Sequence, residues 1–184
     1  KNISTIFFPH IYSMRKYSSW EEATFCPITQ ASPYIVSSVF PDLTILRPEL
    51  DFSGGYAQNQ SLIEMVNQTW QIPIKITQKA YSKAIHAQMQ VEQHIHDQGE
   101  KYLRSVIQSG EIAVIVVGRS YNAFPPETSH SIPKKLVSMG VNVIPFECLQ
   151  IQPDTTGDFP WYFANYIKEA VQWVKNHENF FLLY

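Results

Sequence analysis

The segment IAVIVVG (residues 112–118) constrains the fold more than any other part of the sequence. It is a near-continuous run of apolar, largely β-branched residues that leads directly into glycine. Such a run is typical of a parallel strand that is buried on both faces. We therefore expect this segment to be the central strand of a parallel sheet.

Short apolar runs alternate with amphipathic segments along the rest of the chain. Besides 112–118, strands are expected at 3–9, 43–48, 141–146 and 180–184, and helices at 26–40, about Gln58 to Trp70, 133–139 and 163–177. Segment 26–40 also suits a strand or two short helices, and Pro33 is expected in or near a first helical turn. The alternation predicts an α/β fold with a doubly wound, mostly parallel sheet and right-handed crossovers.

The most periodic segment of the chain begins at Ile76. Its small and apolar residues recur at intervals of three, four or seven, which keeps them on one side of a helix; they are Ala80, Ala84, Ala87, Val91, Ile95, Tyr102 and Val106. A helix of that size is on the order of 50 Å long, so we expect a bend near Gly99. Gly110 is expected to end it.

Composition limits the protein class. The chain has 184 residues, of which 45% are apolar and 16% charged, and it fits one compact domain over 1–184. Its formal net charge of −2 and lack of long charged runs predict no nucleic-acid or anionic-membrane partner. No apolar run approaches the roughly 20 residues that cross a bilayer, and no secretory signal is recognisable. We expect a cytoplasmic protein and, from its abrupt ends, a piece of a longer one.

The loop that follows the central strand is a candidate binding site. In open parallel sheets, ligands bind beyond the carboxyl ends of the strands. Arg119 can hold a carboxylate or phosphate through two N–H groups, and Tyr121 and Asn122 add hydrogen-bonding groups. Alternatively, Arg119 pairs with an acid such as Glu127 or Glu147, and Asn122 only shapes a turn.

Cys26 is the second candidate functional residue. It precedes Pro27 at an expected helix start, where unpaired backbone N–H groups stabilise a thiolate, and this suits a metal ligand or a reactive thiol. Alternatively, it is a small core residue. Cys148 lies in an apolar run that favours packing. The chain has no phosphate-binding P-loop, dinucleotide fingerprint or nucleophile elbow, so nucleotide hydrolysis by this chain is not expected.

Four segments carry a family resemblance. They are FCPITQASPY (25–34), Gly99-Glu100 followed by IAVIVVGRSYNAF (112–124), SIPKKLVSMGVNVIPFECL (131–149), and WYFANYIKEAVQWVKNHENFFLLY (161–184). Together they resemble the region of acyl-CoA dehydratase activase-related proteins that is similar to 2-hydroxyacyl-CoA dehydratase subunits. The resemblance spans nearly the whole chain and implies a Rossmann-like α/β domain.

The resemblance also implies a function in ATP-driven, low-potential electron transfer. In the dehydratases, an ATPase activator passes one electron to a cysteine-bound [4Fe-4S] cluster that drives loss of water from a 2-hydroxyacyl-CoA. Cys26 matches the Cys-Pro position of the family and is the implied partial ligand. The remaining ligands are expected beyond Tyr184, so the cluster is expected in the full-length protein and not in this piece.

Two readings of the function follow from this resemblance. In the first, Cys26 and the loop with Arg119, Tyr121 and Asn122 converge at one edge of the sheet, where the loop binds an acyl-CoA-like molecule or tunes the cluster. The protein is then a dehydratase-like lyase or its activating component, with an ATPase domain or subunit as its partner. In the second, the chain is a non-catalytic docking or scaffolding module beside an ATPase portion, and Cys26 only packs.

The chain departs from the family pattern at two positions. Ser120 stands where the family usually has proline, which frees a backbone N–H and is expected to loosen the turn mildly. Cys148 stands where the family commonly has an apolar or aromatic residue. Its thiol is therefore not implied as a ligand.

Overall fold

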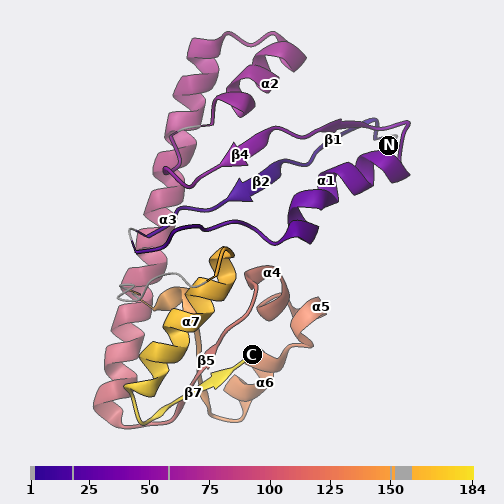
Figure 1. Ribbon diagram of the computed structural model, residues 1–184. Coiled ribbons are helices and arrows are strands. Elements are labelled where there is room, and N and C mark those ends of the chain that lie inside the picture. The colour runs from indigo at the N-terminus through magenta and orange to yellow at the C-terminus, as the bar shows by residue number, and fades with distance from the viewer. Residues whose placement is uncertain (1–2, 18, 58, 150, 152–158) are drawn as a thin grey trace. The chain divides into compact units, whose positions relative to one another are not determined.

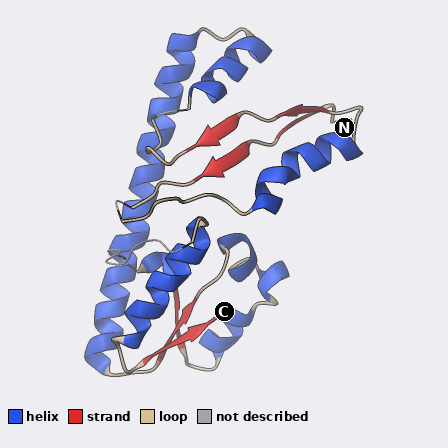
Figure 2. Cartoon of the chain, viewed as in Figure 1, coloured by secondary structure: helices blue, strands red, loops and turns tan. Residues whose placement is uncertain are grey.

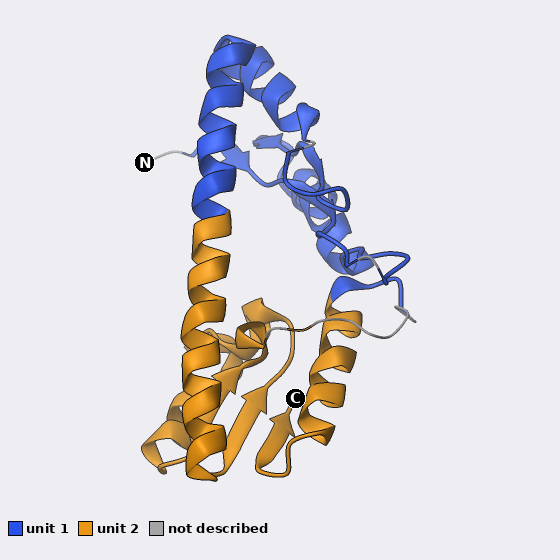
Figure 3. Ribbon diagram, turned by 90° about the vertical axis from the view of Figure 1, so that its left-hand side faces the viewer, with its two compact units in different colours: residues 1–88, 156–162 blue, residues 89–155, 163–184 orange. Residues whose placement is uncertain are grey.

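The computed structural model describes residues 3–17, 19–57, 59–149, 151 and 159–184. The chain divides into two compact units (Figure 3): unit 1 comprises residues 1–88 and 156–162, and unit 2 comprises residues 89–155 and 163–184. That the two units fold together as the single domain expected from composition stays a prediction.

Unit 1 contains two parallel strand pairs that follow one another along the chain (Figure 1). They are β1 (Thr5–Phe7) with β3 (Thr44–Leu46), and β2 (His10–Ser13) with β4 (Glu49–Asp51). Pro9 and Pro48, which have no backbone N–H to donate, separate the two pairs. The pairing resumes beyond them, because the N–H of His10 donates to the carbonyl of Pro48 at 3.0 Å.

The predicted strands at 3–9 and 43–48 therefore end too early. The extended backbone expected to stop at 9 and at Pro48 continues through β2 and β4 to Ser13 and Asp51. A proline ends a strand only where its missing N–H was needed by a neighbour, and here each proline falls between hydrogen-bonded residues. The two strand pairs thus form a ribbon interrupted by proline.

Helix α1 (Pro27–Val39) connects the two strands of this ribbon and lies against β2 and β3 (Figure 1). It is a single helix, so the alternatives of a strand or two short helices are wrong. Pro27 occupies the first turn as expected, but Pro33 lies in the helix interior. The missing hydrogen bond of Pro33 is offset by packing, since its ring is less than 2% exposed.

Two further helices follow, α2 (Gln60–Trp70) and α3 (Ile74–Ser109). The expected start of α2 at Gln58 lies outside the described residues. Helix α3 confirms the long helix predicted from the periodic segment, and Gly110 follows it with a positive φ of 68°. Its residues up to 88 belong to unit 1 and the remainder to unit 2.

Helix α3 continues without a break through Gly99, and the bend expected there stays a prediction. Gly99 is buried against Cys148: a Cβ at Gly99 would lie 2.5 Å from the Cβ of Cys148 and 2.7 Å from its carbonyl oxygen. These separations are far below van der Waals contact. The glycine is therefore required for close packing of α3 against the segment around Cys148.

Unit 2 is built on a three-stranded parallel sheet (Figure 2). Its strands are β5 (Ala113–Val116), β6 (Asn142–Pro145) and β7 (Phe180–Leu183), in the order β6-β5-β7. The connections are α4 (Ser120–Ala123), α5 (Pro126–Ser129) and α6 (Ile132–Ser138) between β5 and β6, and then the 3₁₀ turn η1 (Phe146–Cys148) and α7 (Tyr162–Lys175) before β7. Strand β5 is central, as expected, and Ala113 and Ile115 have no exposed surface.

The core of unit 2 gathers around Phe146, which is 1% exposed. Its ring stacks on Phe124 with centroids 6.2 Å apart and meets Tyr166 edge-on at 4.9 Å. Leu103 and Val106 of α3 are also buried. This packing covers the sheet and holds the loops at its carboxyl edge.

Parallel strands joined by helices confirm the α/β class. The described strands form two two-stranded sheets and one three-stranded sheet, and one continuous doubly wound, Rossmann-like sheet is not confirmed. None of the helices in the described residues is long and apolar enough to cross a membrane.

Candidate functional site

The strand order of unit 2 creates a natural binding position. From β5 the chain passes to β6 on one side, and β7 is later added on the other side of β5. The boundary between β5 and β7 is therefore the point at which the strand order reverses. In open parallel sheets, the crevice at the carboxyl ends of the strands at such a point is the usual ligand site.

A cavity of about 500 Å³ lies at this point. Its wall is formed by the end of β5 with the following residues (116–119), by Asn122 and Ala123 of α4, by Ser129, Ile132 and Pro133 of the α5–α6 corner, and by residues 183–184 at the end of β7. The predicted site residues Arg119 and Asn122 thus share one cavity.

Local backbone geometry explains how these two side chains reach the cavity. Gly118 has a φ of +148°, and a Cβ there would lie 3.2 Å from the Cβ of Ala123, so glycine suits this sharp turn. Arg119 is extended, and its carbonyl accepts hydrogen bonds from the N–H groups of Asn122 at 2.7 Å and Ala123 at 2.9 Å. One helical turn therefore separates Arg119 from Asn122 and places both on the cavity wall.

Tyr121, the third predicted residue, lies beside the cavity and is not among the described lining residues. Its ring meets Phe163 edge-on with centroids 6.3 Å apart. Its hydroxyl accepts a hydrogen bond from Nη1 of Arg119 at 3.3 Å. Tyr121 is thus placed to orient the guanidinium.

Ser120 gives this loop a contact that a proline could not provide. Its hydroxyl donates a hydrogen bond to the carboxylate of Glu147 in η1. The loop after β5 is therefore joined to the segment after β6. This contact opposes the loosening expected from the loss of the family's proline.

Cys26 lies in unit 1, at the residue immediately before α1. It is half-buried, and its Sγ is 3.6 Å from the hydroxyl of Thr29. The N–H of the preceding Phe25 donates to the carbonyl of Tyr12 at 2.9 Å, which anchors the start of the helix to β2. Cys26 and Arg119 belong to different units, so their convergence at one edge stays a prediction.

The described residues do not supply a complete metal site. No group of three or more histidine, cysteine, aspartate or glutamate side chains among them could hold an ion. Burial and the nearby charge of Glu147 raise the pKa of Cys148, which favours its neutral thiol. Since a [4Fe-4S] cluster takes about four ligands, Cys26 could not hold a cluster alone, and its role as one ligand stays a prediction.

Sequence reasoning missed the parts of the cavity wall that come from the α5–α6 corner and from the end of β7. The corner contains two consecutive residues with positive φ, His130 at 49° and Ser131 at 56°. Neither is glycine, so no local signal marked the turn. The contribution of β7 depends on the strand order, although its segment was correctly predicted as a strand.

In a comparison with protein families, residues 1–149 match the family described as CoA enzyme activase uncharacterised domain. The matched range contains Cys26 and the loop after β5. No match was found among curated proteins or among solved structures. Because the matched range covers most of the sequence, the chain belongs to the CoA enzyme activase uncharacterised domain family.

Proposed function

We propose that this chain is a ligand-binding and redox-supporting module of a CoA enzyme activase. The cavity between β5 and β7 holds part of an acyl-CoA-like molecule, and Cys26 supplies one ligand of a [4Fe-4S] cluster in the full-length protein. The proposal rests on one observation above all, the cavity at the point where the strand order reverses, with Arg119 on its wall. Family membership supports the class of ligand.

The residues at the cavity are suited to binding and orientation. The guanidinium of Arg119 is positively charged and presents a planar set of N–H donors to an oxygen of the ligand. Asn122 adds an amide that both donates and accepts. Tyr121 accepts from the guanidinium and so restricts its rotation. No residue is assigned to bond breaking.

The environment of Cys26 supports thiolate ligation. The first turn of α1 leaves backbone N–H groups without helical partners next to the sulfur, and their partial positive charge favours the thiolate. A bound cluster would supply one-electron transfer at low potential. The other ligands would come from outside the described residues, and ATP hydrolysis from an ATPase domain or subunit, in the cytoplasm.

The order β6-β5-β7 also supports a finer view of the fold. It is the arrangement of one reversal in a doubly wound sheet. We therefore propose that unit 2 is the Rossmann-like part of the domain.

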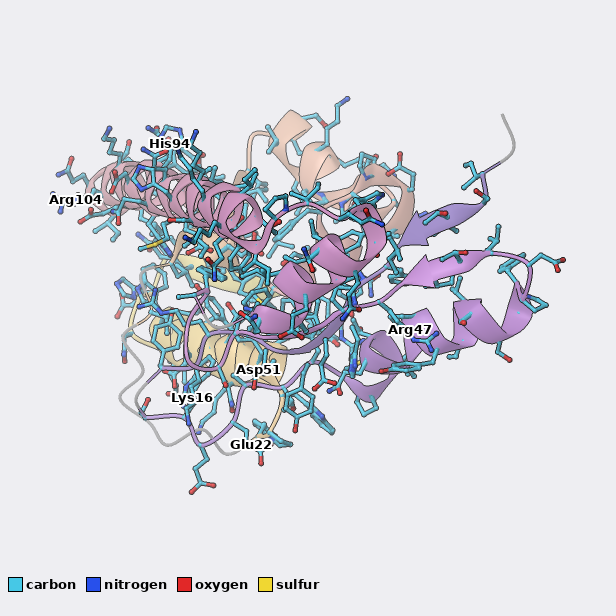
Figure 4. All side chains as sticks on the ribbon, turned by 90° about the horizontal axis from the view of Figure 1, so that it is seen from above. Lys16, Glu22, Arg47, Asp51, His94 and Arg104 are labelled. Atoms are coloured by element: carbon cyan, nitrogen blue, oxygen red, sulfur yellow. The ribbon has the colours of Figure 1, made fainter. Side chains whose placement is uncertain are left out.

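A calorimetric titration tests the binding role. Full-length protein, Arg119→Ala and Arg104→Ala are titrated with butyryl-CoA under the same conditions. Arg104 is a matched control because it is an exposed arginine on α3 (Figure 4). It forms an ion pair with Glu100. We expect Arg119→Ala to weaken binding about tenfold or more and Arg104→Ala to leave it unchanged. Absent binding, or equal binding in all three proteins, would contradict the proposal.

Iron analysis tests the redox role. Full-length protein, Cys26→Ala and Cys148→Ala are purified anaerobically, and their iron content and visible spectra are compared. We expect the Cys26 variant to lose most of its iron and the Cys148 variant to keep it. An iron-free parent protein would refute the cluster and favour a docking module.

A further inference from the structure

We infer that the cavity receives the acyl-thioester end of its ligand and leaves the nucleotide end outside. This inference rests on the proposed function, because it assumes an acyl-CoA-like ligand. It goes further in naming which half of that ligand the residues recognise. Its basis is the distribution of apolar and charged groups on the cavity wall.

Most of the wall is apolar. Val116 and Leu183 come from the ends of β5 and β7, Ala123 from α4, and Ile132 and Pro133 from α6. Val116 is only 5% exposed, so this side of the cavity continues into the core of the sheet. Burying a hydrocarbon group against such a wall is favourable by roughly 25 cal/mol per Å² of apolar surface. A short acyl chain suits this part of the cavity.

The charge of the wall is small. Arg119 is the only charged side chain among the described lining residues. The nucleotide end of coenzyme A carries a diphosphate and a further phosphate, and such groups are recognised by several cations or by a set of converging N–H groups. One guanidinium could neutralise only part of that charge, whereas it is enough to bind a single carbonyl oxygen of a thioester or amide.

Two further polar side chains of the wall, Ser129 and Asn122, agree with this assignment. The hydroxyl of Ser129 already donates to the carbonyl of Pro125 at 2.8 Å, so it offers the cavity an acceptor oxygen and not a donor for phosphate. Asn122 offers one amide group. Together with Arg119 these groups match the alternating carbonyl and N–H groups of a pantetheine arm better than they match a polyanion.

The size of the cavity also argues for one end of the ligand. About 500 Å³ lies within the range of roughly 300–1,000 Å³ found for pockets that enclose compact ligands. An extended acyl-CoA is too long to be enclosed there as a whole. The half that fits the wall is the acyl-pantetheine half.

The test separates the two halves of the ligand. The full-length protein is titrated with butyryl-pantetheine and, separately, with 3′-phosphoadenosine 5′-diphosphate, and both titrations are repeated with Ala123→Leu and Arg119→Gln. Ala123→Leu fills the apolar part of the cavity. Arg119→Gln replaces the charge of an exposed side chain by a neutral amide. We expect each variant to weaken butyryl-pantetheine about tenfold or more and to leave nucleotide binding unchanged.

The opposite pattern, with nucleotide binding weakened and butyryl-pantetheine unaffected, would overturn the inference. Circular dichroism verifies that both variants are folded. If Ala123→Leu does not fold, the titrations of Arg119→Gln alone decide the test. Failure of the inference is distinguishable from failure of the proposed function. If intact butyryl-CoA binds and depends on Arg119 while its acyl half does not, only the inference fails; if butyryl-CoA does not bind, both fail.

Discussion

The two units use parallel strands in different ways. In unit 2, β5 has a strand on each side and Ile115 is fully buried, whereas in unit 1 each described strand has a single partner and Phe7 is 52% exposed. A reversal of strand order requires a strand with neighbours on both sides. Among the described strands, β5 alone meets that condition, which explains why the cavity lies in unit 2. The candidate functional residue of unit 1 is Cys26, whose thiol lies at the start of α1.

The largest expected effect concerns the apolar core that holds the unit 2 sheet. Phe146→Ala should lower the free energy of unfolding by about 3–5 kcal/mol, since the ring is 1% exposed and its removal leaves a cavity beside Phe124 and Tyr166. Urea unfolding measures the loss. Phe181→Ala, at a residue 54% exposed on β7, is the control and should cost under about 1 kcal/mol. Equal losses would remove the contrast between core and surface.

The next prediction concerns Gly99→Ala, for which helix propensity alone would predict the opposite change in stability. Within a helix, glycine to alanine normally stabilises by about 1 kcal/mol. Gly99→Ala should instead destabilise by about 2–3 kcal/mol, because the new methyl group would overlap Cys148. Gln98→Ala, at an exposed neighbouring position on α3, should be nearly neutral. A stabilised Gly99→Ala protein in thermal unfolding would show that α3 does not pack closely on η1.

The sequence predicted those features that depend on local patterns. Three features can be recognised from consecutive residues alone: the apolar run at 112–118, the periodicity of α3 and the glycine-arginine loop. In the structure they form a central strand, one helix and part of a cavity wall, respectively. The strands after Pro9 and Pro48 were not predicted, because they are short and form only through their pairing with each other. The contact between Gly99 and Cys148 was missed because it joins distant parts of the chain.

Unit 1 contains a buried polar network around Asn59, and this provides the third test. Asn59 is 2% exposed; its Oδ1 accepts from the N–H of Asp51 at 3.0 Å and its Nδ2 donates to the hydroxyl of Tyr81 at 3.1 Å. Asn59→Ala should cost about 2 kcal/mol, because it removes the acceptor of the Asp51 N–H and one of the two hydrogen bonds of the Tyr81 hydroxyl, which still donates to the carbonyl of Tyr56. Asn67→Ala, which removes an exposed bond to the carbonyl of Ile72, should cost less than half of that in chemical unfolding. Equal costs would mean that the network contributes little.

The smallest effect is a pH dependence in unit 1. Burial acts to raise the pKa of Asp51, but hydrogen bonds from Ser13 and Ser53 outweigh it and leave the pKa below its usual value. A lowered pKa in the folded state stabilises the protein above about pH 4, and this stabilisation is lost as the pH falls through the folded value. Ser13→Ala should therefore flatten the loss of stability below about pH 4. The unfolding midpoints of the unchanged protein and of Ser13→Ala are measured from pH 2 to 7. Parallel curves for the two proteins would contradict the role of the Ser13–Asp51 hydrogen bond.

The proposed function depends most on the cavity of unit 2 being the ligand site. Hydrogen–deuterium exchange of the full-length protein, measured with and without saturating butyryl-CoA, tests this directly. We predict slower exchange over residues 116–123 and 129–133, and unchanged exchange over the ribbon residues 44–51 of unit 1. Slower exchange over 44–51 with none over 116–123 would contradict the account.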